Sequence, residues 1–339
     1  MRVGAFVLAA QFPGQGQGES LHRALRSAEV AEESGLDSVW LAEHHFVPYG
    51  VCPSAVTLAA LVLGRTSRIR VGTAVSVLPS AHPVALGEQA ALLHIASGGR
   101  FSLGVGRGGP WVDLEVFGAG LEAYESGFPE SLDLLLRWLR EPSVSAEGER
   151  FAFREVPVVP RAAELLGTDA EGPEVVVACT SPKSVKLAAE RGLPMLLGMH
   201  CGDEEKAAMV ALWRRTAREA GHSPEGAHVS AGVAQIADRP AEAAETLLKA
   251  MPGWLKQGLD AHVTVDGRHR AMRDPVAYTE MLCGLHPVGP PALAADRIAA
   301  TAEKTGISRF ALLVEGSGDV AATEENVRRL GAEVLPLIG

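Results

Sequence analysis

Strand-like apolar runs alternate with helical segments along almost the whole chain of 339 residues, and this alternation restricts the fold more than any other feature. The runs expected to form strands are residues 3–10, 38–46, 69–78, 101–106, 174–180, 194–199, 228–237 and 309–315. Chains of this kind form parallel sheets with right-handed helical crossovers. Eight such units favour an α/β fold of the closed (β/α)8 TIM barrel type over an open doubly wound sheet.

The chain is expected to form one domain over residues 1–339, because no linker or internal repeat divides it. Residues 142–160 combine Val, Phe and Pro without a helical period and predict a β insertion outside the barrel repeat. A helix is expected to begin at Pro240, and residues 253–290 predict a long, irregular, lid-like loop before the last strand. Further helices are expected from Ser20, from about Tyr124 to Arg140, and over residues 83–96, where a proline occupies the first turn.

The charge balance excludes several kinds of partner. A formal charge of −10, from 41 acidic and 31 basic residues, argues against nucleic acid and against an anionic membrane, because either would favour a basic patch. No apolar run approaches the ~20 residues that span a bilayer, and the first run ends at Gln11 without a signal-peptide cleavage pattern. Cys52, Cys179, Cys201 and Cys283 are far apart, which favours reduced thiols over disulfides or a metal site. We therefore expect a cytoplasmic protein without a bound metal.

Two segments that follow strands have residues suited to binding a phosphate. In a TIM barrel the carboxyl ends of all strands meet at one face, where active sites lie. Arg107 precedes two glycines, which lets a ligand approach and leaves the guanidinium free for a bidentate contact with an anion. Ser181 precedes Pro182 at an expected helix start, with Thr180 before it and Ser184 one turn later, so hydroxyl and N–H groups converge.

Each of these two signals also has an ordinary structural explanation. Arg107 fits a surface arginine in a Gly-rich turn, and Ser181 fits a helix cap. No Walker-type loop is present and we expect no Rossmann-type dinucleotide site, so a mononucleotide phosphate fits better than a triphosphate or a dinucleotide.

The apolar run Ser38–Phe46 ends in the ionisable residues Glu43, His44 and His45. Side chains alternate across a strand, so only one of the two histidines need face a pocket. An imidazole exchanges protons near neutral pH, which permits a catalytic role, but a lone buried histidine is more often structural. Taken alone, this stretch favours the structural interpretation.

Three segments resemble the bacterial luciferase-like, flavin-dependent monooxygenases: residues 42–46 (AEHHF), 71–84 (VGTAVSVLPSAHPV) and 98–108 (GGRFSLGVGRG). The similarity continues through residues 113–118 (DLEVFG), 188–197 (AAERGLPMLL), 287–289 and the last helix, so it covers nearly the whole chain. This resemblance implies a TIM barrel and reduced FMN supplied by a separate flavin reductase. It also implies dioxygen as co-substrate and a peroxyflavin that oxidises a hydrophobic organic substrate, such as an aldehyde or a secondary metabolite.

The resemblance assigns roles to four residues near the flavin. His44 matches the family's catalytic histidine, a general base or proton shuttle, and His45 is expected to support structure or a subunit contact. Arg107 matches the arginine that binds the flavin phosphate. Asp113 matches a position close to the active site, although a helix cap or a loop hydrogen bond explains it about equally well.

Five further residues match positions that hold the cofactor. Thr180, Ser181 and Ser184 match the phosphate-binding turn. Ala74 and Val75 fall where the family has a non-proline cis peptide bond beneath the flavin ring.

The chain also departs from the luciferase catalytic subunit. Gly106 replaces a reactive cysteine that precedes the arginine, which predicts a roomier pocket and a less shielded peroxyflavin. Met199 occupies the place of an expected tryptophan, while Trp254 is expected to retain an aromatic wall of the site. A shorter loop between Trp254 and Pro287 argues against efficient light emission, because lids exclude water from reactive intermediates.

The same resemblance predicts a homodimer through the helix over residues 83–96, including Glu88, although an ordinary outer helix of the barrel explains that segment too. Two other functions stay open. A deazaflavin-dependent dehydrogenase would use the same face of a related barrel for hydride transfer. A non-catalytic flavin-binding partner subunit is the third interpretation, and the presence of both His44 and Arg107 argues against it.

Overall fold

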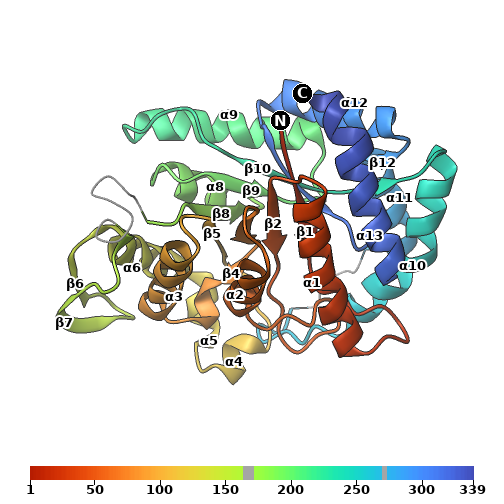
Figure 1. Ribbon diagram of the computed structural model, residues 1–339. Coiled ribbons are helices and arrows are strands. Elements are labelled where there is room, and N and C mark those ends of the chain that lie inside the picture. The colour runs from red at the N-terminus through yellow and green to blue at the C-terminus, as the bar shows by residue number, and fades with distance from the viewer. Residues whose placement is uncertain (163–171, 269–272) are drawn as a thin grey trace.

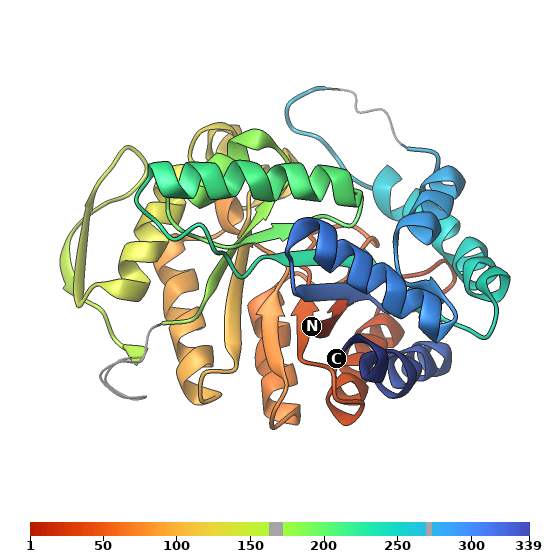
Figure 2. The same ribbon diagram turned by 90° about the horizontal axis from the view of Figure 1, so that it is seen from above.

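The computed structural model of the chain describes residues 1–162, 172–268 and 273–339. Parallel strands close into a barrel, because β3 pairs with β5 at one point of the ring and β1 pairs with β13 at another. In barrel order the strands are β1 (Arg2–Val7), β2 (Ser38–Leu41), β3 (Arg70–Thr73), β5 (Phe101–Gly106), β8 (Val175–Cys179), β9 (Met195–Leu197), β10 (Val229–Val233) and β13 (Arg309–Leu313). The predicted (β/α)8 TIM barrel is confirmed, and helices surround the strands in Figures 1 and 2.

The longer helices form the outer layer of the barrel (Figure 2). They are α1 (Gln17–Glu33), α2 (Ala55–Arg65), α3 (Pro83–Ala96), α6 (Phe128–Arg140), α8 (Pro182–Ala189), α9 (Asp203–Glu219), α10 (Pro240–Asp260), α11 (Pro275–Leu285), α12 (Pro291–Thr305) and α13 (Val320–Arg329). Within the described residues, none of the helices is long and apolar enough to cross a membrane.

Shorter elements complete the chain. The helical ones are η1 (Leu78–Ser80), α4 (Asp113–Val116), α5 (Gly120–Glu125), η2 (Leu330–Val334) and α14 (Leu335–Ile338). The short strands are β4 (Ser76–Val77), β6 (Ser143–Glu147), β7 (Ala152–Pro157), β11 (Gln235–Ile236) and β12 (Val288–Gly289). Figure 1 shows α4 and α5 at the lower end of the barrel, away from the two chain termini at its upper end.

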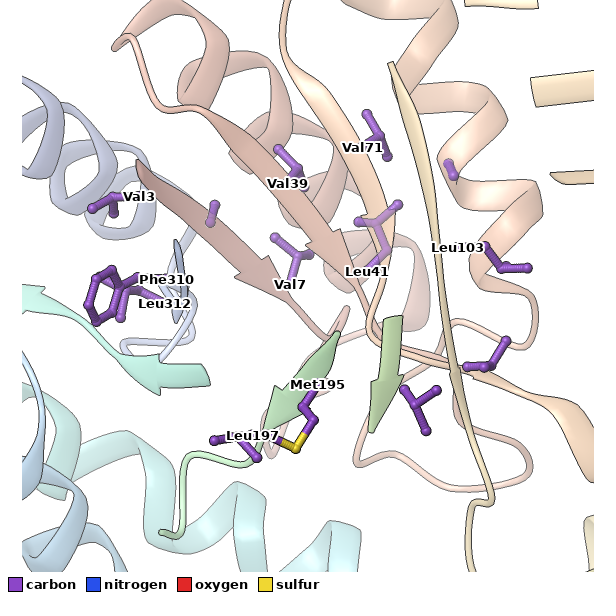
Figure 3. Packing of buried hydrophobic residues seen from close by; sticks show 14 of the residues in the cluster. Val3, Val7, Val39, Leu41, Val71, Leu103, Met195, Leu197, Phe310 and Leu312 are labelled. Atoms are coloured by element: carbon purple, nitrogen blue, oxygen red, sulfur yellow. The ribbon is translucent and has the colours of Figure 1, made fainter. Parts of the chain in front are cut away.

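Side chains of β1 alternate between two apolar clusters, as expected for a strand buried on both faces. Val3 and Val7 belong to the cluster between strands and helices, part of which Figure 3 shows. Phe6 belongs to the cluster inside the barrel, together with Trp40 of β2. A Cβ at Gly72 of β3 would lie 2.6 Å from the Trp40 ring, so glycine at that position lets the indole fill the barrel.

Several predicted elements are confirmed. The helix over residues 83–96 has those bounds, and residues 142–160 contain an antiparallel hairpin of β6 and β7 outside the barrel. Other predicted bounds are wrong. Ser20 lies inside α1, which begins at Gln17 after an N-cap at Gly16, and the helix expected from Tyr124 is divided into α5 and α6. The strand expected over residues 69–78 ends at Thr73, because a cis peptide bond between Ala74 and Val75 separates β3 from β4.

The interpretation of residues 253–290 as an irregular lid is wrong for most of that range. Helix α10 continues through Pro252 to Asp260, and α11 begins at Pro275. Leu247, Met251, Trp254, Leu255 and Gly258 are buried at spacings of three and four residues, so packing of one apolar face maintains the helix beyond the proline. Only a short segment, partly outside the described residues, joins the two helices.

Candidate active site

A cavity of about 660 Å³ opens where the carboxyl ends of β2, β3 and β5 meet the end of α10. The cavity thus lies at the carboxyl ends of the barrel strands, where TIM-barrel enzymes have their active sites. Its lining combines ionisable and aromatic side chains with small residues: Glu43, His44, His45, Tyr49, Ala74, Val75, Val77, Gly108, Gly109, Trp111, Asp113, Leu259, Asp260, His262, Thr264 and Arg268.

His44 is fixed at the wall of the cavity by its neighbours. Its ring meets Tyr49 edge-on with centroids 4.9 Å apart, and its backbone N–H donates to the carbonyl of Cys52 over 2.9 Å. Nδ1 is buried and has no hydrogen-bond partner in the described part of the chain. Burial, with the charges of His262 and His45, lowers the pKa of His44 to about 3. The imidazole is therefore neutral near pH 7 and can accept a proton.

Glu43 connects three elements around the cavity. Its Oε2 accepts a hydrogen bond from the N–H of Ala55, at the start of α2, over 3.0 Å. Its Oε1 accepts one from the N–H of Val77 in β4, also over 3.0 Å. A carboxylate at a helix N-terminus is favoured by the helix dipole. Glu43 thus holds the segment after the cis peptide bond against the end of β2, and His45 Nε2 lies 3.5 Å from the same carboxylate.

Ala74 and Val75 lie on the cavity wall and are joined by a cis peptide bond. Gly106, at the end of β5, faces Val75, since a Cβ at this glycine would lie 2.5 Å from Val75 Cγ2. The predicted extra room beside Gly106 is therefore wrong, because the side chain of Val75 occupies that space.

Asp113, the first residue of α4, is buried at the cavity wall. Its Oδ2 accepts a 2.6 Å hydrogen bond from Ser80 Oγ, which fixes the carboxylate. Oδ1 is buried and accepts no hydrogen bond from any residue that the structure describes. A buried, unpaired carboxylate oxygen is costly unless a ligand donates to it, so Asp113 is suited to bind an N–H or O–H group in the cavity.

Two segments that contribute Trp111 and Thr264 to the cavity lining pair with each other. The N–H of Val112 donates to the carbonyl of Val263, and the N–H of Val265 donates to that of Pro110, both over 2.9 Å. Between these bonds Trp111 pairs with Thr264, and the Trp111 ring lies 4.7 Å from that of His262. The pairing joins the loop after β5 to the chain that leaves α10.

The residues predicted to bind phosphate lie on neighbouring strand ends. Leu103 to Val105 of β5 pair with Val175 to Val177 of β8, so the ends of both strands lie side by side. Arg107 is exposed and its guanidinium lies 4.2 Å from the ring centroid of Tyr124.

The turn before α8 forms a capping box. Ser181 Oγ accepts from the N–H of Ser184, while Ser184 Oγ accepts from the N–H groups of Thr180 and Ser181 over 3.2 Å each. Neither this turn nor Arg107 belongs to the lining of the cavity, so both lie beside it.

Two residues predicted at the site are located behind its wall. Met199 belongs to the apolar cluster inside the barrel, and its carbonyl accepts a hydrogen bond from His286 Nε2. Trp254 is fully buried, stacks on Tyr49 with centroids 4.8 Å apart, and donates from Nε1 to the Tyr49 carbonyl over 3.0 Å. Trp254 therefore supports an aromatic wall, and Tyr49 forms the surface that faces the cavity.

Tyr49, Trp111 and His262 line the cavity but were not predicted as site residues. Tyr49 and Trp111 follow strand ends in the sequence, and that position is the signal that could have identified them. His262 carries no such signal, because its place depends on how far α10 extends. Among the described residues, no group of three or more His, Cys, Asp or Glu side chains could hold a metal ion.

Comparison with known proteins agrees with this geometry. The luciferase-like monooxygenase family matches residues 1–309. The chain belongs to this family. Luciferase-like monooxygenases are flavin-dependent oxidoreductases, and the chain is an enzyme of that class. The alkanal monooxygenase alpha chain of Photorhabdus luminescens is 29% identical over 356 aligned positions, which cover 100% of this chain and 98% of the relative.

Solved structures of luciferase-like proteins have the same fold. Monooxygenase RslO1 from Streptomyces bottropensis aligns with a TM-score of 0.85 at 23% identity and covers 100% of both chains. The oxygenating constituent of 3,6-diketocamphane monooxygenase from Pseudomonas putida, in complex with FMN, gives 0.78 at 22% identity and covers 100% of this chain and 99% of that one. An F420-dependent secondary alcohol dehydrogenase aligns with a TM-score of 0.77 at 18% identity, and the alignment covers 100% of this chain and 99% of that one.

Proposed function

We propose that the protein is a monooxygenase that uses reduced FMN and dioxygen to oxidise a hydrophobic organic substrate. One observation carries the proposal: a neutral, fixed imidazole, that of His44, lines a cavity large enough for a ligand at the functional face of the barrel. An imidazole in this state can take a proton from a bound reactant and return it.

The cavity fits a flavin ring on its own chemistry. Asp113 Oδ1 and His44 Nδ1 are buried and have no hydrogen-bond partner among the described residues, and a flavin ring offers polar edges that could satisfy such atoms. Ala74 and Val75 provide an apolar part of the wall. Beside the cavity, Arg107 and the N-terminus of α8 are the groups that would hold the phosphate.

When bound, reduced flavin would supply the electrons that activate dioxygen. The chain's own residues orient the reactants, exclude water and handle protons. The paired Trp111 and Thr264 segments form part of the cavity wall, and His44 accepts a proton at its ring. Tyr49, Val77 and Leu259 add apolar surface, which favours a hydrophobic substrate.

The test is NADH-driven oxidation of a panel of aldehydes and larger apolar compounds with a flavin reductase present, read by mass shift and by light emission. We expect an oxygen-dependent product with a mass gain of one oxygen atom. The variant His44→Ala should lower kcat by about 10²-fold or more, whereas His222→Ala, at an exposed site, should leave it unchanged. Full turnover by His44→Ala would refute the assigned role of this residue, and no product with any substrate would favour a non-catalytic partner subunit.

A deazaflavin-dependent dehydrogenase is the second candidate, because an F420-dependent alcohol dehydrogenase shares the fold. Measuring affinities for reduced FMN and for the deazaflavin in parallel separates the two. Tighter binding of the deazaflavin, with alcohol oxidation in the absence of oxygen, would favour the dehydrogenase.

We also propose a homodimer that forms through α3. This helix exposes Glu88 and Leu92, and the neighbouring α2 exposes Leu61. Exposed leucines of two adjacent helices suit an isologous interface. Sedimentation of the protein and of a Leu92→Glu variant tests this proposal, which requires the variant to sediment as a monomer. The flavin reductase is proposed as a transient partner that supplies reduced FMN.

A further inference from the structure

Three imidazoles line the cavity, those of His44, His45 and His262, and His262 has no part in the role assigned to His44. It lies two residues beyond the end of α10 and lines the cavity. Its Nδ1 is 3.0 Å from the carbonyl oxygen of Gly258. A carbonyl can only accept, so Nδ1 carries the hydrogen. In the neutral ring Nε2 then holds the lone pair, and it makes no hydrogen bond within the described part of the chain.

The neighbouring rings fix the orientation of this imidazole. The ring of Trp111 lies 4.7 Å from that of His262, and the ring of Tyr49 lies 6.2 Å from it. Tyr49 also meets His44 edge-on. The two histidines thus contact the same phenol ring, and both line one cavity.

Charges around His262 differ from those around His44. Burial lowers the pKa of His262, while hydrogen bonding at the end of α10 and the carboxylate of Asp113 act in the opposite direction. No carboxylate opposes the fall in the pKa of His44, which burial, His262 and His45 all lower. The other ionisable groups that line the cavity are Glu43, Tyr49, Asp260 and Arg268. His262 is therefore the imidazole that is better able to keep a proton.

We propose that His262 is a second proton-handling residue of the site, which binds the reactant through Nε2 and holds the proton that is released in the reaction. This inference rests on the proposed monooxygenase function. In the step, an O–H or N–H bond of the bound reactant breaks and an N–H bond forms at Nε2. The reactant keeps the electron pair, and the resulting imidazolium is balanced by the Asp113 carboxylate. No oxidant is consumed in this transfer.

With His262 in the same cavity, the neutral His44 need not be the one residue that handles protons there. Because the pKa of His44 is about 3, its imidazolium form is scarce near pH 7, and another imidazole in the same cavity adds a further proton acceptor. His262 lines the same cavity as His44, and the rings of both residues contact Tyr49.

Two substitutions at His262 distinguish a role in binding the reactant from a role in accepting its proton. The change His262→Gln retains a hydrogen-bonding group that cannot titrate, and His262→Phe retains only a ring against Trp111. With chemically reduced FMN, we expect His262→Gln to keep the KM within about threefold, lose one ionisation from the pH profile of kcat, and lower kcat by 10-fold or more. His262→Phe should also raise the KM. The matched control His222→Phe lies at an exposed position and should change none of these.

A second measurement needs no turnover. The ring nitrogens of His44 and His262 can be titrated by NMR in the free protein and with oxidised FMN. We expect removal of the His262 charge in His262→Phe to raise the pKa of His44, and FMN to shift the Nε2 resonance of His262. The inference would be overturned by an unchanged pH profile of kcat in His262→Gln. It would also be overturned if FMN did not shift the His262 resonance. If the wild-type protein forms no oxygenated product while FMN still shifts that resonance, the monooxygenase function fails and His262 stands as a ligand-binding residue.

Discussion

The ring of Tyr49 lies between His44 and Trp254, meeting the histidine edge-on at 4.9 Å and stacking on the tryptophan at 4.8 Å. Since the tryptophan Nε1 also donates to the Tyr49 carbonyl, the phenol ring is held from one side while it holds His44 on the other. His44 is therefore positioned by α10, through Trp254, as well as by its own strand. Gly258 permits this packing, because a Cβ there would lie 2.7 Å from the Tyr49 backbone.

This contact predicts different outcomes for two substitutions at Tyr49. Tyr49→Phe preserves the ring and should leave stability and the His44 environment nearly unchanged. Tyr49→Ala opens a cavity against Trp254 and should cost about 3 kcal/mol of unfolding free energy. It should also admit water to His44, and since burial is the main cause of the low pKa, that pKa should rise from about 3 towards its ordinary value. Urea unfolding and NMR titration of His44 measure both effects, and an unmoved His44 pKa in Tyr49→Ala would count against this explanation.

The two hydrogen bonds that Glu43 accepts predict that its substitution changes both the stability of the protein and the shape of the cavity. In Glu43→Gln one carboxylate oxygen becomes an amide nitrogen, which cannot accept from Ala55 or from Val77. Loss of one such hydrogen bond should cost about 1–3 kcal/mol. The KM for flavin should rise as well, because β4 loses its connection to the end of β2. Glu33→Gln, at an exposed site on α1, is the control in thermal unfolding and in kinetics, and equal behaviour of the two variants would contradict the assigned role.

The side chain of Val75 fills the space next to Gly106, which has no side chain of its own. An added Cβ at Gly106 would approach Val75 Cγ2 to 2.5 Å, so Gly106→Ala should destabilise the protein by about 1–3 kcal/mol through overpacking. The double variant Gly106→Ala with Val75→Ala should recover most of that loss, since the clashing methyl group is gone.

A double-mutant cycle in urea measures this coupling. Gly64→Ala on α2, where a new Cβ meets nothing within 4 Å, is the control and should not lose stability. Strictly additive effects of the two changes at positions 75 and 106 would show that the residues do not share the space.

The sequence predicts the barrel and the order of its strands well, since both follow from local patterns, although the strands expected to end at residues 46 and 78 end at Leu41 and Thr73. The Glu43 to His45 stretch and Arg107 come directly after strands, and parallel strands bring their carboxyl ends together. The sequence does not reveal what fills the space between strands. A glycine at position 106 suggests an open pocket, whereas the nearest side chain, that of Val75, belongs to another strand end.

The far wall of the cavity illustrates a second limit. Pro252 and Gly253 suggest that a helix ends there, yet burial of Trp254 and Leu255 against the barrel maintains α10 for two further turns. Tertiary packing outweighs the local preference of these two residues. Because His262 lies just after that helix, its place in the cavity depends on packing that the sequence does not display.

His228 gives a prediction for stability against pH. This residue is buried, accepts a 3.0 Å hydrogen bond at Nδ1 from the N–H of Met195, and packs edge-on against Trp213 at 4.5 Å. Burial, with nearby Arg214 and Arg309, lowers the pKa of His228 to about 4 from an ordinary 6.5. Below pH 6.5 His228 is protonated in the unfolded chain but stays neutral in the folded chain. The unfolding free energy should therefore fall as the pH drops from 6.5 towards 4.

The loss from this one residue should reach up to about 3 kcal/mol at pH 4, and nothing should be lost above pH 7. His228→Asn cannot titrate and keeps an acceptor for Met195, so it should flatten the dependence even if it lowers stability at pH 7. His44 and His286, whose pKa values burial lowers to about 3 and about 4, act with the same sign and leave part of the slope in place. Urea unfolding between pH 4.5 and 7.5 compares the variant with His222→Asn at an exposed site, and slopes that are equal in these two variants would show that His228 is not the source.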